Sequence, residues 1–222
     1  MRIYCLIFIS LFFIQLKAQK TMDYLALGDS YTIGEAVPSK DNWPNQLVSR
    51  LQDEGVLINE PYIIATTGWR TDELIEAIQK DKKVKDKYDL VSLLIGVNNQ
   101  YQKKSLEVYE KDLRKLVSIA IEKSVRGAQG VFMVGIPDYG HTEYAKEKNL
   151  TNVAENIEKF NRVASKIAKE YNLPFYPLFT LSQKFFGQSD MFVEDQLHPS
   201  AKQYGEWVNS FYEQLKKDRI SD

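Results

Sequence analysis

The stretch LALGDSYTIGE, residues Leu25 to Glu35, decides how the rest of the chain is interpreted. The apolar run from Tyr24 to Leu27 is typical of a strand that is buried on both faces. Gly28, Asp29 and Ser30 follow it directly, and small polar residues of this kind often form turns. In an open α/β sheet, ligands bind beyond the carboxyl ends of the strands. Ser30 is therefore a candidate nucleophile as well as a candidate for an ordinary turn residue.

Four more short apolar runs follow along the chain, and segments with helical periodicity separate them. Apolar residues recur at i, i+3 and i+4 within residues 43–51, 74–78, 106–120, 153–171 and 204–215. This alternation predicts an α/β fold in which a parallel sheet lies between two layers of helices. The further strand candidates are Tyr62 to Ala65, Leu90 to Ile95, Val131 to Val134 and Phe175 to Leu178.

The first 18 residues have the pattern of a secretory signal peptide. Arg2 precedes an apolar stretch from Ile3 to Leu16, and Lys17 and Ala18 follow it, the alanine at a plausible cleavage point. The stretch is shorter than the roughly 20 residues that a spanning helix requires. We expect a secreted or periplasmic protein with no stable membrane insertion once the leader is removed. An uncleaved N-terminal anchor is the alternative.

Residues 19–222 have the size and composition of one globular domain, since the 222-residue chain is 44% hydrophobic and 27% charged. Cleavage after Ala18 removes Cys5, the only cysteine, and with it any disulfide, zinc thiolate or cysteine nucleophile. The formal net charge is −1; loss of Arg2 and Lys17 leaves 27 basic against 30 acidic residues, a net charge of −3. A nucleic-acid partner is therefore not expected.

Polar blocks follow the predicted strands at positions that would share one edge of the sheet. Together they supply a hydroxyl, two imidazoles, carboxylates, an amide and glycines. Serine hydrolysis needs a base, an acceptor that orients this base, and donors for the developing oxyanion. Ser30 can serve as nucleophile, an Asp-x-x-His segment as orienter and base, and Asn98 with backbone N–H groups as donors. The later blocks are Thr66 to Arg70, Gly96 to Asn99, Pro137 to His141 and Asp195 to Pro199.

The identity of the base is open on spacing alone. His141 follows Asp138 by three residues, and His198 follows Asp195 by three residues. Local arguments favour His198, because the Pro199–Ser200 pair keeps it out of a helix and offers a cap for the next one. The helix N-terminus would disfavour the imidazolium and Asp195 would oppose that effect, which suits a base that is charged only transiently.

The blocks LALGDSYT, TGWRTDEL, LLIGVNNQ and EDQLHPS resemble, in order and rough spacing, those of the GDSL-type esterases, also called SGNH hydrolases. The first and last blocks are the most specific, and the resemblance extends from about Tyr24 to the last helix. It implies a three-layer α/β/α fold with a five-stranded parallel sheet in flavodoxin-like order.

The resemblance also implies roles for individual residues. Ser30 would be the nucleophile, His198 the base and Asp195 its partner. The oxyanion hole would consist of the backbone N–H groups of Ser30 and Gly68 and the side-chain amide of Asn98. Neither a metal nor an organic cofactor is required for this chemistry.

One position departs from the pattern, because Asn99 stands where the family usually has an aspartate after the asparagine. This puts in doubt whatever contact the aspartate makes. We expect Tyr31, Trp69 and Asn99 to contact the substrate. Family members act on small acyl esters, lysophospholipids, thioesters or acetylated sugars, so the expected partner is a small-molecule or carbohydrate ester.

Two other functions use the same residues. A metal-dependent phosphoesterase would bind its ions with Asp29, Asn98, Asp195 and His198, although a dinuclear site usually has more histidine or carboxylate ligands. A non-catalytic secreted glycan-binding module would keep the fold without turnover. The complete set of nucleophile, base and donors favours the esterase.

Overall fold

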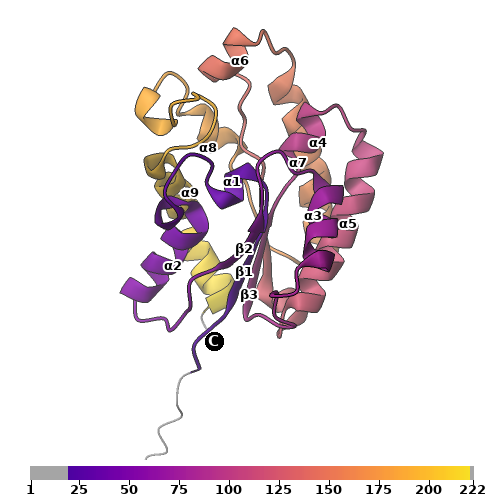
Figure 1. Cartoon of the computed structure of the whole chain (residues 1–222), viewed down its shortest axis with the longest axis vertical. Helices are drawn as coiled ribbons and strands as arrows, with labels where there is room; N and C mark the ends of the chain where they lie inside the picture. The colour runs from indigo at the N-terminus through magenta and orange to yellow at the C-terminus, as the bar shows by residue number, and fades with distance from the viewer. Residues whose placement is uncertain (1–19, 221–222) are drawn as a thin grey trace, which may run out of the picture.

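Five parallel strands run through the middle of the molecule (Figure 1). The computed structural model describes residues 20–220. The strands are β1 (Tyr24–Gly28), β2 (Tyr62–Ala65), β3 (Leu90–Leu94), β4 (Val131–Val134) and β5 (Phe175–Tyr176). Their order in the sheet is β2-β1-β3-β4-β5, which confirms the flavodoxin-like α/β/α architecture.

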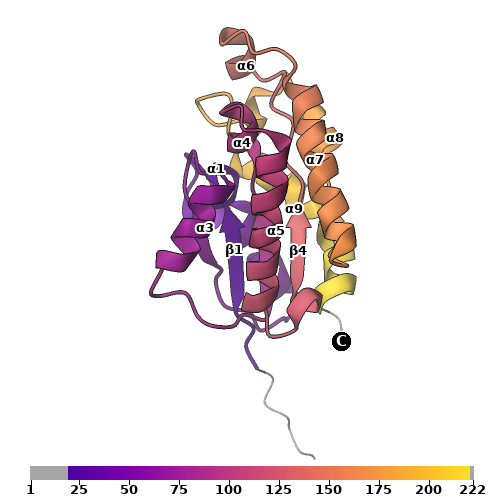
Figure 2. The same ribbon diagram turned by 90° about the vertical axis from the view of Figure 1, so that its right-hand side faces the viewer.

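Helices cover both faces of this sheet (Figures 1 and 2). The helices α2 (Trp43–Asp53) and α9 (Ala201–Leu215) lie on one face. The other face carries α3 (Thr71–Lys80), α5 (Leu106–Lys123) and α7 (Val153–Glu170). Shorter helical turns complete the chain: α1 (Ser30–Ile33), η1 (Ser39–Asp41), α4 (Val97–Tyr101), η2 (Gly127–Gly130), α6 (Glu143–Glu147), α8 (Phe179–Gln183), η3 (Ser189–Met191) and the π-helical η4 (Lys216–Ile220).

The core lies on both sides of the sheet because the strands are apolar at nearly every position. All residues of β1, β3 and β4 are buried. On the α2–α9 face an aromatic cluster fills the space, with ring centroids 6.3 Å apart for Trp43 and Phe132 and 5.2 Å apart for Tyr176 and Phe211. Burying one such side chain stabilises the fold by about 1.5–3 kcal/mol.

The sheet differs from the sequence prediction mainly at its last strand. The predicted strand from Phe175 to Leu178 ends at Tyr176 instead. Pro177 has no N–H group for the ladder, and Leu178 is already the cap residue of α8. The four short helices α1, α4, α6 and α8 were not predicted, because a helix of four or five residues shows no periodicity.

The N-terminal signal peptide predicted at residues 1–18 lies outside the described residues. Within residues 20–220, no helix combines the length and the apolar character that crossing a bilayer requires.

Gly96 connects β3 to α4 in a conformation that other residues avoid. Its φ is +128°, and a Cβ added there would lie 2.5 Å from Cε2 of Tyr109 and 3.0 Å from Cδ1 of Ile136. The glycine thus lets α4 begin immediately after the strand, and α4 carries Asn98.

We expect Gly96→Ala to lower the free energy of unfolding by about 2–4 kcal/mol, because strain and overpacking add. Gly127→Ala is the matched control, since Gly127 also has a positive φ (+58°) but has nothing within 4 Å of the added Cβ. The control should lose only about 1 kcal/mol. Urea denaturation measures both variants, and equal losses would contradict the steric argument.

Candidate active site

Ser30 is the first residue of α1, immediately beyond the end of β1. Only 4% of its surface is exposed, and it lines a cavity at the carboxyl edge of the sheet. The N–H groups of the first helical turn have no partners within their own helix. The backbone N–H of Ser30 is therefore at a position where it can donate to a ligand oxygen.

Asp29 is the cap of this short helix and is completely buried. One carboxylate oxygen accepts a hydrogen bond from the N–H of Tyr31 (3.1 Å), whereas Oδ2 has no partner among the described residues. Burial raises the pKa of Asp29 to about 7, against the opposing effect of the capping hydrogen bond. A carboxyl group whose ionisation is unfavourable thus lies next to the candidate nucleophile.

The structure brings His198 and Asp195 together on the loop before α9. Nδ1 of His198 lies 2.6 Å from Oδ2 of Asp195. The other oxygen of Asp195 accepts the N–H groups of Leu197 (2.8 Å) and His198 (2.9 Å). Both carboxylate oxygens are thus engaged, and they hold the loop and the imidazole in one arrangement. The predicted cap of the next helix is confirmed, because Ser200 Oγ accepts from the N–H of Gln203 (3.3 Å).

The hydrogen bonds of Asp195 determine which nitrogen of His198 is free. Burial alone would raise the pKa of Asp195, but hydrogen bonds from the His198 ring and from two backbone N–H groups lower it below its ordinary value. An ionised carboxylate only accepts, so Nδ1 carries the proton and Nε2 of a neutral ring is an acceptor. His198 lines the same cavity as Ser30. Tyr31 packs edge-on against the imidazole, with centroids 6.0 Å apart.

The two further residues that we expect to donate to the oxyanion also lie at this cavity. Gly68 follows β2 in a turn with a φ of +85°, and Asn98 lies in α4; both line the cavity with Ser30. Nδ2 of Asn98 donates one hydrogen bond to the carbonyl oxygen of Trp69 (3.0 Å). An amide nitrogen has two hydrogens, so this bond orients the group and leaves one hydrogen for a ligand.

Tyrosines form the rest of the cavity wall. Its volume is about 120 Å³. The hydroxyl groups of Tyr101 and Tyr144 are hydrogen-bonded to each other (2.9 Å), and the Tyr139 hydroxyl donates to Oε1 of Gln100 (2.7 Å). Sequence analysis does not single out Tyr139 and Tyr144, which come from the long segment after β4 and carry no periodic signal. The lining residues are Ser30, Tyr31, Thr67, Gly68, Val97, Asn98, Tyr101, Tyr139, Tyr144, Leu197 and His198.

Of the three predicted substrate contacts, only Tyr31 lines the cavity. The side chain of Asn99 is buried, and its amide binds Thr71 twice: Oδ1 accepts from the N–H (3.1 Å) and Nδ2 donates to Oγ1 (2.7 Å). Asn99 therefore joins the loop after β3 to the start of α3, and it does not line the cavity. Trp69 packs against the hydrophobic core instead of the cavity. Neither Trp69 nor Asn99 is therefore placed where we expected it, at the wall of this cavity.

The other Asp-x-x-His segment does not form a comparable pair. His141 is exposed and contacts the ring of Phe186 at 5.4 Å. The carboxylate of Asp138 is buried and accepts from the N–H of Gly140 (2.7 Å) and from Gln183 (2.9 Å). The geometry therefore distinguishes two Asp-x-x-His segments that are equivalent by spacing alone.

The metal-site alternative requires Asp29, Asn98, Asp195 and His198 to provide the ligands. Asp29 caps α1 in the interior instead. Within residues 20–220, no three histidine, cysteine, aspartate or glutamate side chains gather in a way that could hold a metal ion. The ligand set of this alternative is not assembled.

Comparison with known proteins identifies the family of this chain. Residues 26–205 match the model of the GDSL-like lipase/acylhydrolase family. A search of curated protein sequences finds no match.

Several solved structures share the fold. TesA is 20% identical, with a TM-score of 0.67, over 88% of this chain and 98% of its own. Axe2, an acetylxylan esterase from Geobacillus stearothermophilus, is 20% identical, with a TM-score of 0.65, over 87% and 94%. The esterase EstA from Pseudoalteromonas sp., solved in a form inhibited by monoethylphosphonate, is 18% identical, with a TM-score of 0.63, over 88% and 97%.

The buried carboxyl of Asp29 predicts a specific pH dependence of stability. The folded-state pKa of about 7 is above the ordinary value of 3.8. Between these values the unfolded chain has lost the proton and the folded chain retains it, so stability falls as pH rises from about 4 to about 7. Relative to Asp29→Asn, which keeps a capping oxygen, the wild type should lose roughly 4 kcal/mol over this range. Urea denaturation across the range measures this difference, and parallel curves would contradict it.

Proposed function

The chain belongs to the GDSL-like lipase/acylhydrolase family, and on that premise we propose that it is a serine esterase that hydrolyses carboxylic esters through an acyl-enzyme. The observation that carries the proposal is that Ser30 and His198 line one cavity while Asp195 holds the imidazole. The expected leader would export the enzyme, so the proposed location is secreted or periplasmic.

In the first step, Oγ of Ser30 attacks the ester carbonyl and Nε2 of His198 takes the hydroxyl proton. The imidazolium that forms is stabilised by Asp195, which lies 2.6 Å from Nδ1. His198 then protonates the departing alcohol. Water repeats the sequence on the acyl-enzyme, with His198 again as base, and releases the acid.

The oxyanion forms where three donors can reach it: the backbone N–H groups of Ser30 and Gly68 and the free amide hydrogen of Asn98. Donors of this kind act on charge that appears only near the transition state, and they are most effective when they are held in place beforehand. Asn98 meets this condition because its amide is fixed to the carbonyl of Trp69.

The size of the cavity favours a short acyl group. A dry cavity of about 150 Å³ accommodates benzene, so the 120 Å³ beside Ser30 accommodates a group of a few heavy atoms. A long acyl chain does not fit in this cavity. Acetyl and similarly short esters of a small molecule or a carbohydrate are the proposed substrates.

A fluorophosphonate probe tests the nucleophile and its base together. We expect covalent labelling of Ser30, identified by peptide mass spectrometry, and none in Ser30→Ala. His198→Ala should abolish both labelling and hydrolysis of p-nitrophenyl acetate, because the described residues that line the cavity include no other imidazole and no carboxylate. The matched control His141→Ala removes an exposed imidazole and should retain both. Loss in His141→Ala and retention in His198→Ala would transfer the base to the Asp138 segment, and an unlabelled wild type would contradict the esterase.

The oxyanion donor has its own test. Asn98→Ala should lower kcat for p-nitrophenyl acetate by roughly 10²–10³ with far less change in KM, because the lost hydrogen bond matters in the transition state. Asn98→Asp keeps the size of the side chain but removes the donor and adds a negative charge, so it should lose at least as much. Undiminished kcat in Asn98→Ala would remove this residue from the site.

A further inference from the structure

A second, larger groove begins at the wall of the catalytic cavity. It has a volume of about 860 Å³ and lies between the segment after α4 and the start of α7. Tyr101 and Tyr139 line both the cavity and this groove. The cavity and the groove therefore adjoin at these two side chains.

The charged residues that line the groove are all basic. Lys103, Lys104 and Lys159 line it, and its described lining residues include no aspartate or glutamate. Lys159 is neutralised by Glu155 at 2.7 Å. The ammonium groups of Lys103 and Lys104 form no ion pair or side-chain hydrogen bond with any residue in the described part of the chain. In a chain with a net charge of −1, such a concentration of positive charge attracts anions.

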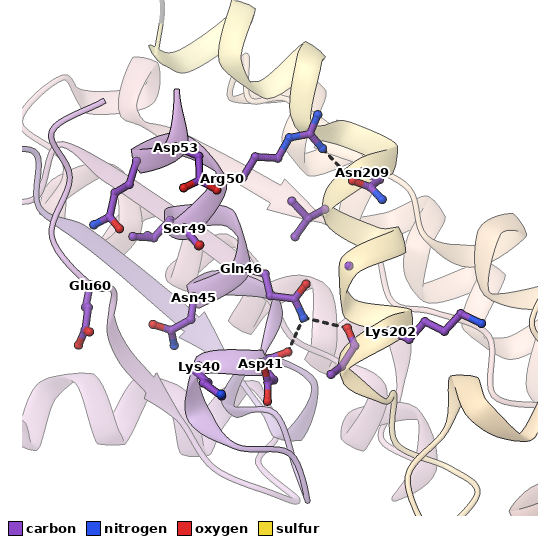
Figure 3. A pocket seen from close by; sticks show the side chains of 15 residues that line it. Lys40, Asp41, Asn45, Gln46, Ser49, Arg50, Asp53, Glu60, Lys202 and Asn209 are labelled. Carbon is purple, nitrogen blue, oxygen red and sulfur yellow. Dashed lines mark hydrogen bonds between the residues drawn. The ribbon is translucent and has the colours of Figure 1, made fainter. Parts of the chain in front are cut away.

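The other large groove shows that this excess of basic residues is not a general feature of the surface. Figure 3 shows that groove, of about 870 Å³, between α2 and α9. Its three basic residues are matched by three acidic ones: Lys40, Arg50 and Lys202 against Asp41, Asp53 and Glu60. Arg50 also binds Asn209 and Glu213, and Lys202 pairs with Asp190.

Lys103 follows the end of α4. Its φ is +57°, a left-handed conformation that glycine or asparagine adopts at lower cost. The N–H of Lys104 donates to the carbonyl oxygen of Asn99 (2.8 Å), which is the usual way for a helix to end. The turn directs the chain so that residues 103 and 104 both line the groove.

The remaining lining residues fit a saccharide. Tyr101, Tyr139 and Phe160 provide aromatic surface, and Gln100, Asn149 and Asn156 provide amides that hydrogen-bond to hydroxyl groups. We propose that this groove binds the acidic part of an acylated oligosaccharide, with Lys103 and Lys104 recognising a uronate carboxylate away from the ester. This proposal rests on the esterase function proposed above and names its substrate class.

The test compares two substrates that differ only in charge: an acetylated galacturonate oligomer, and the same oligomer with its carboxylates reduced to alcohols. Release of acetate gives kcat/KM for each. The wild type should prefer the acidic oligomer by about tenfold at low salt, and the preference should shrink as ionic strength rises.

The variant Lys103→Asn/Lys104→Gln removes both charges, and asparagine tolerates the left-handed backbone at 103. We expect its kcat/KM on the acidic oligomer to fall about fivefold or more, while values for the reduced oligomer and p-nitrophenyl acetate stay unchanged. The matched control Lys40→Gln/Lys202→Gln removes the same charge from the groove of Figure 3 and should keep the preference. A wild type without preference, or a double variant that keeps it, overturns the proposal.

Direct binding separates failure of the groove from failure of the esterase. Titration calorimetry with the unacetylated galacturonate oligomer needs no catalysis, and Ser30→Ala should bind as the wild type does. Binding that is lost in the Lys103/Lys104 variant supports the groove even if no ester is cleaved, and absence of binding overturns it. Stronger competition by glycerol phosphate than by galacturonate would identify the anion as a phosphate and overturn the saccharide assignment.

Discussion

The position of β1 in the sheet is the constraint on which the site depends. β1 pairs in parallel with β2 on one side and with β3 on the other. The connection after β1 runs through α2 on one face, and the connection after β2 runs through α3 on the opposite face. Neighbouring loops therefore diverge and leave a crevice at the carboxyl edge. Ser30, Gly68 and Asn98 follow β1, β2 and β3, so one topological feature brings the three together.

A layer of contacts behind the cavity holds these groups in place. Asp195 uses both oxygens to hold His198 and its loop, and Tyr31 packs between that imidazole and Trp207. Asn99 ties the loop after β3 to Thr71, whose hydroxyl in turn donates to Asp112 (3.2 Å). An asparagine can donate to the threonine hydroxyl, which an ionised aspartate cannot. The Asn99 amide thus serves the Thr71 hydroxyl as a donor, whereas an ionised aspartate could only accept from it.

Two features next to the site lower the stability of the folded protein. Asp29 is completely buried, and one of its oxygens has no partner within residues 20–220. Gly96 holds a backbone conformation that other residues avoid. Both lie next to residues that the proposed mechanism uses, Ser30 and Asn98. Local choices that disfavour folding are expected at functional sites, where the arrangement of groups matters more than the stability of each one. The aromatic core under α2 and α9 offsets these costs.

The sequence by itself determined the alternation of strands and helices, the buried character of each strand and the polar blocks at the strand ends, because these depend on local periodicity and composition. The sequence left His141 and His198 equivalent by spacing, since both follow an aspartate at the same distance, and only local arguments and the family resemblance favoured His198. It could not show that Asn99 faces Thr71 or that Tyr139 and Tyr144 wall the cavity. Those facts were decided only by the tertiary structure, because they depend on where long loops cross one another in space, and the pairing of distant segments leaves no periodic trace in the chain.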